Sequence, residues 1–185
     1  MEVPFETGQG CDVDVSLFDV ALHQLGYAGT WYLNTGDAPT RLPRGAHLSV
    51  PPVQTFRTAD GWVYVMCMTD KFWNALLGVL GEPNITEEPH FANQALRARY
   101  RDELTQALDR VFSESPTSHW LEALSGVLPI SPVLTVPQAL ENQFVQEVDM
   151  VRTVPHPLAP DMRLLGNPLK FDGNRPTQRV CGPLE

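Results

Sequence analysis

Alternation of apolar and polar residues is clearest between residues 53 and 68. Two β-prone runs, at 55–59 and 62–68, carry side chains of opposite character at successive positions. A period of two sends one face of a strand into a core and leaves the other face at least partly wet. The dipeptide Asp60-Gly61 separates the two runs and readily takes the positive φ angles of a type I′ turn. The pattern therefore predicts a β-hairpin with a tight turn at Asp60-Gly61.

The hairpin leads directly into an amphipathic helix. Apolar residues recur at helical spacing over residues 70–80, where Thr69 can cap the start and Gly81 can end the helix. Together the hairpin and this helix form the densest apolar block of the chain, so we place the core there.

A second apolar stripe lies near the start of the chain. Residues 11–15 alternate like a short strand, and Ser16 opens a capping box for a helix over residues 16–28. Prolines and glycines in residues 34–50 predict a loop that crosses to the hairpin. The helix stripe consists of Leu17, Phe18, Ala21, Leu22, Leu25 and Ala28.

The second half of the chain mixes short helices with extended, proline-rich segments. Proline restricts both its own backbone and that of the preceding residue, which forces several of these segments to be extended. The predicted elements are a turn at 82–84, a helix over 91–113 broken near Tyr100, a helix from Ser115 through Leu124, an extended stretch at 129–134, a short helix from Thr135 toward Phe144, a strand at 150–154, irregular structure at 155–168 and a frayed tail at 173–185.

Composition restricts the classes of function. The chain has 185 residues, 43% of them hydrophobic and 19% charged, which is typical of one folded domain with a real core. A net charge of -9 argues against nucleic acid or an anionic membrane as partner, because both need clustered basic residues. No run approaches the ~18 apolar residues of a membrane span. The start of the chain lacks signal-peptide character, and the three cysteines form no CxxC pair, so we expect a reducing cytoplasm.

Few residues have the spacing of a chemical site. Five histidines lie far apart with no ligand spacing, so no metal site is expected. Hydrolase and nucleotide-binding signatures are absent. Asp12 and Asp14 could form a carboxylate pair on one face of a strand, although a solvated strand edge explains them as well.

Aromatic and basic residues leave similar alternatives open. Trp62, Trp73 and Trp120 fall on apolar stripes and are expected in the core rather than in a cofactor site. A helical array at Arg97, Arg99 and Arg101 could meet a phosphate, but a solvated helix face is the simpler interpretation. From these residues alone, no active site is visible.

Several phrases in the sequence nevertheless resemble one known family. The motifs occur in the same order as in that family. They are Thr-Gly-Gln-Gly-Cys-Asp-Val-Asp-Val-Ser-Leu-Phe-Asp at 7–19, Pro-Pro-Val-Gln-Thr-Phe with Thr-Ala-Asp-Gly at 51–61, Phe91 with Arg97 and Arg-Asp-Glu-Leu at 101–104, Ser-Pro-Val-Leu-Thr at 131–135 and Gly-Asn-Pro-Leu-Lys-Phe at 166–171. Over residues 5–173 the chain resembles the C-terminal half of the family III CoA-transferases, the CaiB/BaiF group.

The resemblance implies an activity and a cofactor-like substrate. Members of the family transfer coenzyme A between carboxylic acids through an aspartate that forms a mixed anhydride and then an aspartyl-CoA thioester. That aspartate lies upstream of the element matched here, so we assign the catalytic role to no residue of this chain, including Asp12, Asp14 and Asp19. The family's glycine-rich loop corresponds to Gly45-Ala46-His47, and these three residues are the predicted contact with CoA.

The resemblance also implies an α+β fold with a particular organisation. We expect the family's small domain, with its hairpin and several helices, at 44–148. Segments that belong to the incomplete α/β large domain would flank it, as a lead-in at 1–43 and a proline-rich return at 149–185. The apolar stripes of these flanks would then seek cover from a second copy of the chain, in a homo-oligomer, or from a missing N-terminal half.

Three functional hypotheses remain open. The first is the C-terminal half of a CoA-transferase, inactive alone, as a truncated product or one part of a split enzyme. The second is a non-catalytic dimerisation or binding module. The third is a fragment of the α-methylacyl-CoA racemase branch, which moves a proton next to the thioester.

Overall fold

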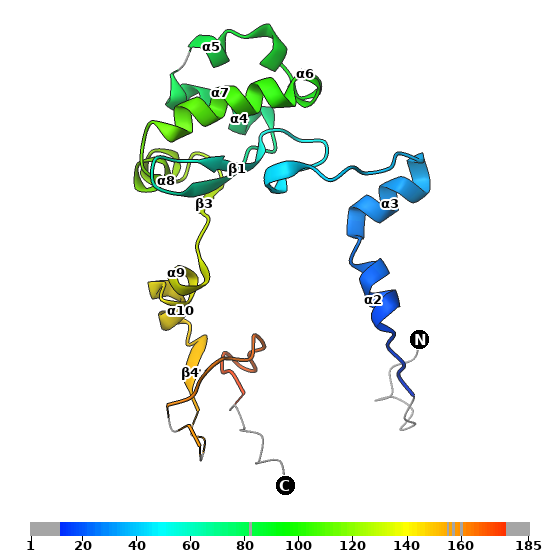
Figure 1. The fold of residues 1–185 in the computed structure, drawn as a ribbon, viewed down its shortest axis with the longest axis vertical. Helices are drawn as coiled ribbons and strands as arrows, with labels where there is room; N and C mark the ends of the chain where they lie inside the picture. The colour runs from blue at the N-terminus through cyan, green and yellow to red at the C-terminus, as the bar shows by residue number, and fades with distance from the viewer. Residues whose placement is uncertain (1–11, 82, 155, 157, 160, 177–185) are drawn as a thin grey trace.

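A compact core with two projecting arms makes up the computed structural model, which describes residues 12–81, 83–154, 156, 158–159 and 161–176. The chain enters through the first arm, builds the core and leaves through the second arm (Figure 1). Helices and short antiparallel sheets confirm the predicted α+β class.

A three-stranded antiparallel sheet lies at the centre of the core. Strand β2 (Trp62–Met66) pairs on one side with β1 (Val53–Arg57) and on the other with β3 (Ile130–Pro132). Phe56 lies opposite Val63 in this register. The predicted hairpin and the extended stretch at 129–134 are therefore confirmed.

The hairpin turn differs from the predicted type I′ turn. Neither Asp60 nor Gly61 has a positive φ. A four-residue connection from Thr58 to Gly61 is closed by a bond from the Thr58 N–H to the Gly61 carbonyl, at 3.0 Å. The Asp60 carboxylate accepts from the N–H of Thr117 at 2.7 Å and from its hydroxyl at 2.9 Å. A partner distant in sequence thus holds this turn, which local propensity could not indicate.

Six helical segments follow the hairpin and connect it to β3. The predicted helices over 70–80 and from Ser115 are confirmed, and the 91–113 helix is broken at Tyr100 as expected. Of the predicted turn at 82–84, Glu82 lies outside the described residues, and the prediction is wrong for 83–84, where a short helix begins. In order, the segments are α4 (Asp70–Leu80), α5 (Pro83–Thr86), η2 (Pro89–Phe91), α6 (Gln94–Arg99), α7 (Arg101–Ser113) and α8 (Thr117–Leu124).

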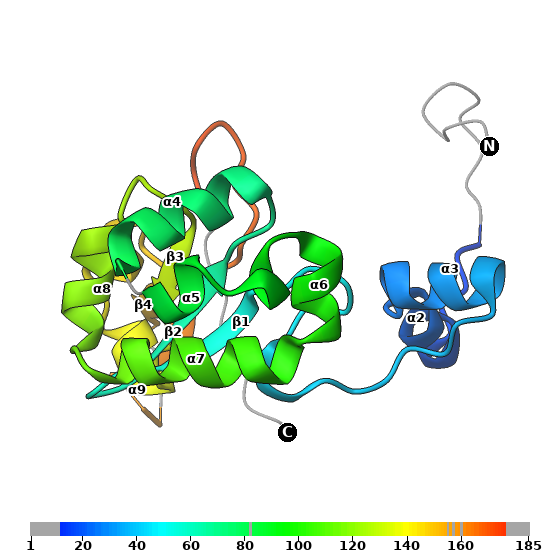
Figure 2. The ribbon, with the colours of Figure 1, turned by 90° about the horizontal axis from the view of Figure 1, so that it is seen from above.

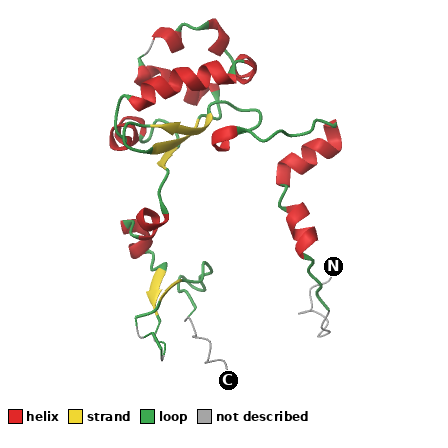
Figure 3. Ribbon diagram, in the orientation of Figure 1, coloured by secondary structure: helices red, strands yellow, loops and turns green. Residues whose placement is uncertain are grey.

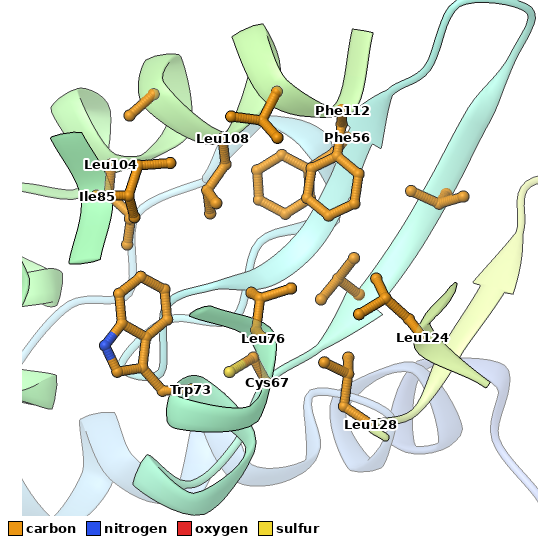
Figure 4. Packing of buried hydrophobic residues seen from close by; sticks show 14 of the residues in the cluster. Phe56, Cys67, Trp73, Leu76, Ile85, Leu104, Leu108, Phe112, Leu124 and Leu128 are labelled. Atoms are coloured by element: carbon orange, nitrogen blue, oxygen red, sulfur yellow. The ribbon is translucent and has the colours of Figure 1, made fainter. Parts of the chain in front are cut away.

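Packing between the sheet and these helices forms the hydrophobic core (Figures 2 and 4). The rings of Phe56 and Phe112 stack with centroids 5.1 Å apart. Trp73 and Trp120 are buried, as predicted for core residues. Trp62 is 39% exposed, so its prediction as a core residue is wrong: it is the first residue of the central strand β2 and lies on the exposed face of that strand.

The first arm consists of α2 (Leu17–His23) and α3 (Gly26–Thr35). Ser16 caps α2 as predicted, but the single helix over 16–28 is wrong. Gly26 has φ 55°, a left-handed conformation that interrupts the helix before it resumes through Thr35. Residues 12–15 form no strand, and Cys11 lies outside the described residues.

Apolar side chains on the arm lie open to solvent. Leu17 is 88% exposed, and neither α2 nor α3 has a buried residue. The expectation that the apolar stripe lacks a partner is confirmed for the described residues.

The second arm runs from β3 through two short helices to a two-stranded sheet (Figure 3). Strand β4 (Val151–Thr153) confirms the predicted strand and pairs with β5 (Arg163–Leu165). Strand β5 corrects the expectation of irregular structure over 155–168. The helices are α9 (Val136–Leu140), capped by Thr135, and α10 (Gln143–Glu147), so the predicted helix toward Phe144 is interrupted. In the expected tail, residues 177–185 lie outside the described residues.

Within the part of the chain described, every helix is too short or too polar to cross a lipid bilayer.

Candidate functional site

The segment predicted to contact CoA forms a sharp bend between the first arm and the core. The one-turn helix η1 (Pro43–Gly45) contains two successive residues in the left-handed region, Arg44 with φ 62° and Gly45 with φ 62°. Glycine takes this conformation without steric cost, whereas arginine is strained there. Such strain persists only where surrounding contacts impose it, and these contacts are common at functional sites.

Contacts with three core elements hold Arg44 in place. Its guanidinium donates to the Asp109 carboxylate on α7 at 2.6 Å and lies 5.8 Å from the Trp62 ring centre. Its carbonyl accepts from the Thr55 hydroxyl on β1 at 3.1 Å. The beginning of the segment is therefore fixed to the core.

His47, at the end of the same segment, contacts the first arm. Its ring stacks on Tyr27 with centroids 5.6 Å apart and meets Trp31 edge-on at 6.4 Å. Its backbone N–H donates to the Val53 carbonyl at 2.9 Å, and its Nδ1 accepts from the Ser49 N–H at 3.2 Å. The three predicted residues thus lie between the arm and the core.

A polar pocket of about 250 Å³ opens beside this segment, against α7. The buried Gln54 side chain is oriented by a bond to the Thr105 hydroxyl at 3.0 Å. Arg101 donates to the Leu48 carbonyl at 3.0 Å, and its partial burial lowers the pKa of the guanidinium through desolvation. The pocket is lined by Pro43, Arg44, Ala46, Gln54, Arg101, Asp102, Thr105, Gln106 and Asp109.

Balanced charge and abundant amide and hydroxyl groups suit this pocket to a polar, hydrogen-bonding ligand portion rather than to a phosphate cluster. Arg44 is already neutralised by Asp109, and Arg101 lies next to Asp102. Sequence reasoning missed the wall on α7. Its signal was the polar stripe Asp102, Thr105 and Asp109, whose spacing of three and four residues places them on one helix face.

A larger pocket, of about 470 Å³, lies between the first arm and the residues that directly follow His47. Trp31 and Thr35 of α3 form one wall, and Leu48 and Ser49, directly after His47, form another. Ala46 of the Gly45–His47 segment thus lines the polar pocket, and the residues directly after His47 line the larger one.

The arginines predicted on a helix face do not assemble into an anion site. Arg97 is buried and pairs with Asp70 at 2.6 Å, so the solvated-face interpretation is wrong for it. Arg101 is half-buried at the polar pocket, while Arg99 is exposed and lies against Tyr100. Arg97 and Arg99 are two residues apart on α6 and so lie on different faces of that helix, and the break at Tyr100 places Arg101 on α7.

The early aspartates also stay apart from the site. Asp12 and Asp14 are exposed and belong to no strand, so they form no carboxylate pair on a strand edge. The N–H of Asp19 donates to the capping Ser16 hydroxyl in α2. Across the described residues, no group of three or more His, Cys, Asp or Glu side chains is placed to hold a metal ion.

Known proteins share both the sequence and this fold. The model of "CoA-transferase family III" matches residues 5–184. The acetyl-CoA:oxalate CoA-transferase of Acetobacter aceti is 31% identical over 180 residues, which are 96% of this chain and 44% of that protein.

Solved structures agree with the fold. A Mycobacterium tuberculosis crystal structure superposes with a TM-score of 0.76 at 22% identity, covering 93% of this chain and 44% of that one. A CAIB/BAIF family protein from Brucella suis gives a TM-score of 0.75 at 24% identity, with the same coverage. The chain thus spans less than half the length of these relatives and matches their C-terminal portion. A family match over nearly every residue, together with the shared fold, confirms the predicted resemblance: the chain belongs to CoA-transferase family III.

Proposed function

We propose that this chain supplies the C-terminal portion of an enzyme that transfers coenzyme A between carboxylic acids. The observation that carries the proposal is the match to family III CoA-transferases over residues 5–184. The catalytic aspartate would come from the part of the family's length that this chain does not span. The chain alone would then transfer no CoA.

The Gly45–His47 segment is the proposed contact with CoA. Its support is the left-handed bend at Gly45, where an added Cβ would meet nothing within 4 Å, and the polar pocket that Ala46 lines. CoA carries amide and hydroxyl groups along its length, and the polar pocket beside Ala46 offers partners for such groups. CoA acts here as a substrate, not as a resident cofactor.

We also propose that the chain is organised as a small domain at 44–148 with flanks at 1–43 and 149–185. In support, the buried hydrophobic cluster runs from Phe56 to Leu128. The exposed apolar side chains of the flanks would be covered by the rest of the enzyme, or by a second copy in a homo-oligomer. A cytoplasmic setting fits the free, buried thiol of Cys67.

Trapping with hydroxylamine tests where the chemistry resides. The purified chain is incubated with an acyl-CoA, a carboxylic acid and hydroxylamine, and its acidic residues are searched for hydroxamates by mass spectrometry. We expect none. A hydroxamate on any aspartate or glutamate of this chain by itself would place the catalytic carboxylate here and overturn the proposal.

Complementation tests whether the chain belongs to an enzyme or is a binding module. The preceding portion of the Acetobacter aceti relative is added to the chain, and CoA transfer is measured. Turnover would support the enzyme, whereas a stable complex without turnover would favour the non-catalytic module.

A matched pair of glycine variants tests the role of the bend in the complemented enzyme. Gly45 and Gly126 both have a positive φ, at 62° and 72°, and at both an added Cβ meets nothing within 4 Å. Gly45→Ala and Gly126→Ala therefore carry similar backbone strain at different places. We expect Gly45→Ala to lower transfer roughly ten- to a hundredfold, as for a small misplacement of a reacting group, and Gly126→Ala to leave it unchanged. If the two variants lowered CoA transfer equally, the bend at Gly45 would have no specific role in the proposed CoA contact.

A further inference from the structure

The segment between the arm and the core is anchored at its two ends by different parts of the molecule. Arg44 is fixed to the core through Asp109 and Thr55, as described above. Three residues later, the ring of His47 lies against Tyr27 and Trp31 of α3. The backbone of His47 is itself held to β1 by the bond from its N–H to the Val53 carbonyl, so a displacement of α3 acts on the segment through the His47 ring.

α3 depends on this contact for its position. It has ten residues and no buried side chain, and a helix of that length is marginal in water unless something packs against it. Tyr27 and Trp31 are four residues apart, so they share one face of the helix, and their rings contact each other at 4.9 Å. His47 completes this cluster from the loop side.

We infer that His47 is a positioning residue, which couples the place of α3 to the conformation of the Gly45–His47 segment through its aromatic contacts with Tyr27 and Trp31. The inference rests on the proposed function in one respect, that this segment contacts CoA. When the apolar arm packs on the rest of the enzyme, its position is passed to the CoA-contacting bend.

The larger pocket follows from the same contact. Its lining comes from α3 at Trp31 and Thr35, from residues 37–40 that follow α3, and from the loop at Leu48 and Ser49, so its width depends on the distance between arm and loop. Loss of the His47 ring would remove the aromatic contact between α3 and this loop.

Hydrogen exchange of the whole isolated chain tests the contact without CoA. Three variants are compared with the parent: His47→Ala, His47→Phe, which keeps a flat ring, and His23→Ala, an exposed histidine on α2 as the control. An aromatic pair contributes enough to slow local opening about two- to tenfold. We expect His47→Ala to speed exchange of α3 and of residues 44–49 by that factor, with α7 unchanged.

We also expect His47→Phe to restore the slow exchange of α3 and of residues 44–49, and His23→Ala to leave their exchange unchanged. Unchanged exchange of α3 in His47→Ala would overturn the inference, as would an α3 that is already unprotected in the parent chain. Failure of His47→Phe to restore protection would exclude ring stacking as the cause. Since no CoA is present, each of these outcomes is independent of the proposed activity.

The coupling to the reaction is measured in the complemented enzyme. His47→Ala should raise the KM for acyl-CoA several-fold more than it lowers kcat, and His47→Phe should restore it. A change of exchange in α3 with an unaltered KM would show a purely structural contact and would overturn the positioning role. Absence of transfer in the parent mixture would instead count against the proposed function, leaving the exchange result to decide the contact.

Discussion

The ion pair between Arg97 and Asp70 should show an asymmetry that ordinary salt bridges lack. The Arg97 side chain is 3% exposed, whereas that of Asp70 is 68% exposed. Removing Asp70 leaves the buried Arg97 cation without its counter-ion, whereas removing Arg97 leaves only a solvated carboxylate. We therefore compare Asp70→Ala, Arg97→Met and the double variant.

The structure sets the expected magnitudes. Asp70→Ala removes the bond from the Arg97 Nη2, at 2.6 Å, and leaves the guanidinium with the Phe91 carbonyl at 3.1 Å and the Trp73 ring at 4.9 Å. Breaking a fully buried pair costs about 3–5 kcal/mol, and the exposure of Asp70 reduces this to about 2 kcal/mol. Arg97→Met loses the bond to Phe91 but also removes a buried Nε that has no partner, so about 1 kcal/mol is expected.

The double variant gives the decisive comparison. Once Arg97 is methionine, loss of the Asp70 carboxylate should cost only the weak interaction with the start of α4, a few tenths of a kcal/mol. Asp70→Ala/Arg97→Met should thus be more stable than Asp70→Ala alone. Urea unfolding followed by circular dichroism gives the four free energies of unfolding. The burial argument would be refuted if the two losses of stability were additive. It would also be refuted if the double variant were less stable than Asp70→Ala.

Three further predictions concern the hairpin turn and the first arm. Gly61→Ala should lower the melting temperature by a few degrees, because its Cβ would lie 3.1 Å from the Thr117 hydroxyl oxygen, and the loss should vanish in a Thr117→Ala background. Bonds from the N–H and the hydroxyl of Thr117 lower the pKa of Asp60 below its ordinary value of 3.8, so the stabilisation they give is present above that pH and is lost as the pH falls through the lowered pKa. The difference in melting temperature between the parent and Asp60→Asn should therefore shrink as the pH falls through the lowered pKa of Asp60. A difference that stays constant over this fall in pH would contradict the prediction. The isolated chain should self-associate in light scattering, and Leu22→Glu should reduce this; a parent that stays monomeric at high concentration without binding an apolar dye would contradict the exposed-face argument.

Much of the core could be predicted because its signals are local. The helix over 70–80 has a capping Thr69, a regular apolar stripe and a terminating Gly81, and each depends on residues within a few positions. The inward face of α7 follows from the same periodicity, because its buried residues recur at spacings of three and four. The family could be identified for a related reason, since its motifs are contiguous phrases.

The candidate site was only partly visible in the sequence. Gly45–His47 could be located by resemblance, but not the contacts that give the segment its shape. Asp109 lies 65 residues from Arg44, and Tyr27 lies on α3, which the predicted single helix over 16–28 did not separate from α2. No local pattern records such pairs.

Tertiary structure decided the features in which distant groups compete with local preference. Asp60-Gly61 favours a type I′ turn by itself, but the Asp60 carboxylate gains two bonds to Thr117 in another conformation. The charge of Arg97 predicts a solvated helix face. In the folded chain, however, Arg97 pairs with Asp70, and the long side chain of Arg97 is buried against Trp73. Sequence alone determines which backbone conformations have low free energy and which faces of the helices and strands are apolar. The choice among these low-energy conformations depends on partners that only the folded chain brings together, because a hydrogen bond to a charged group outweighs the small differences in local propensity.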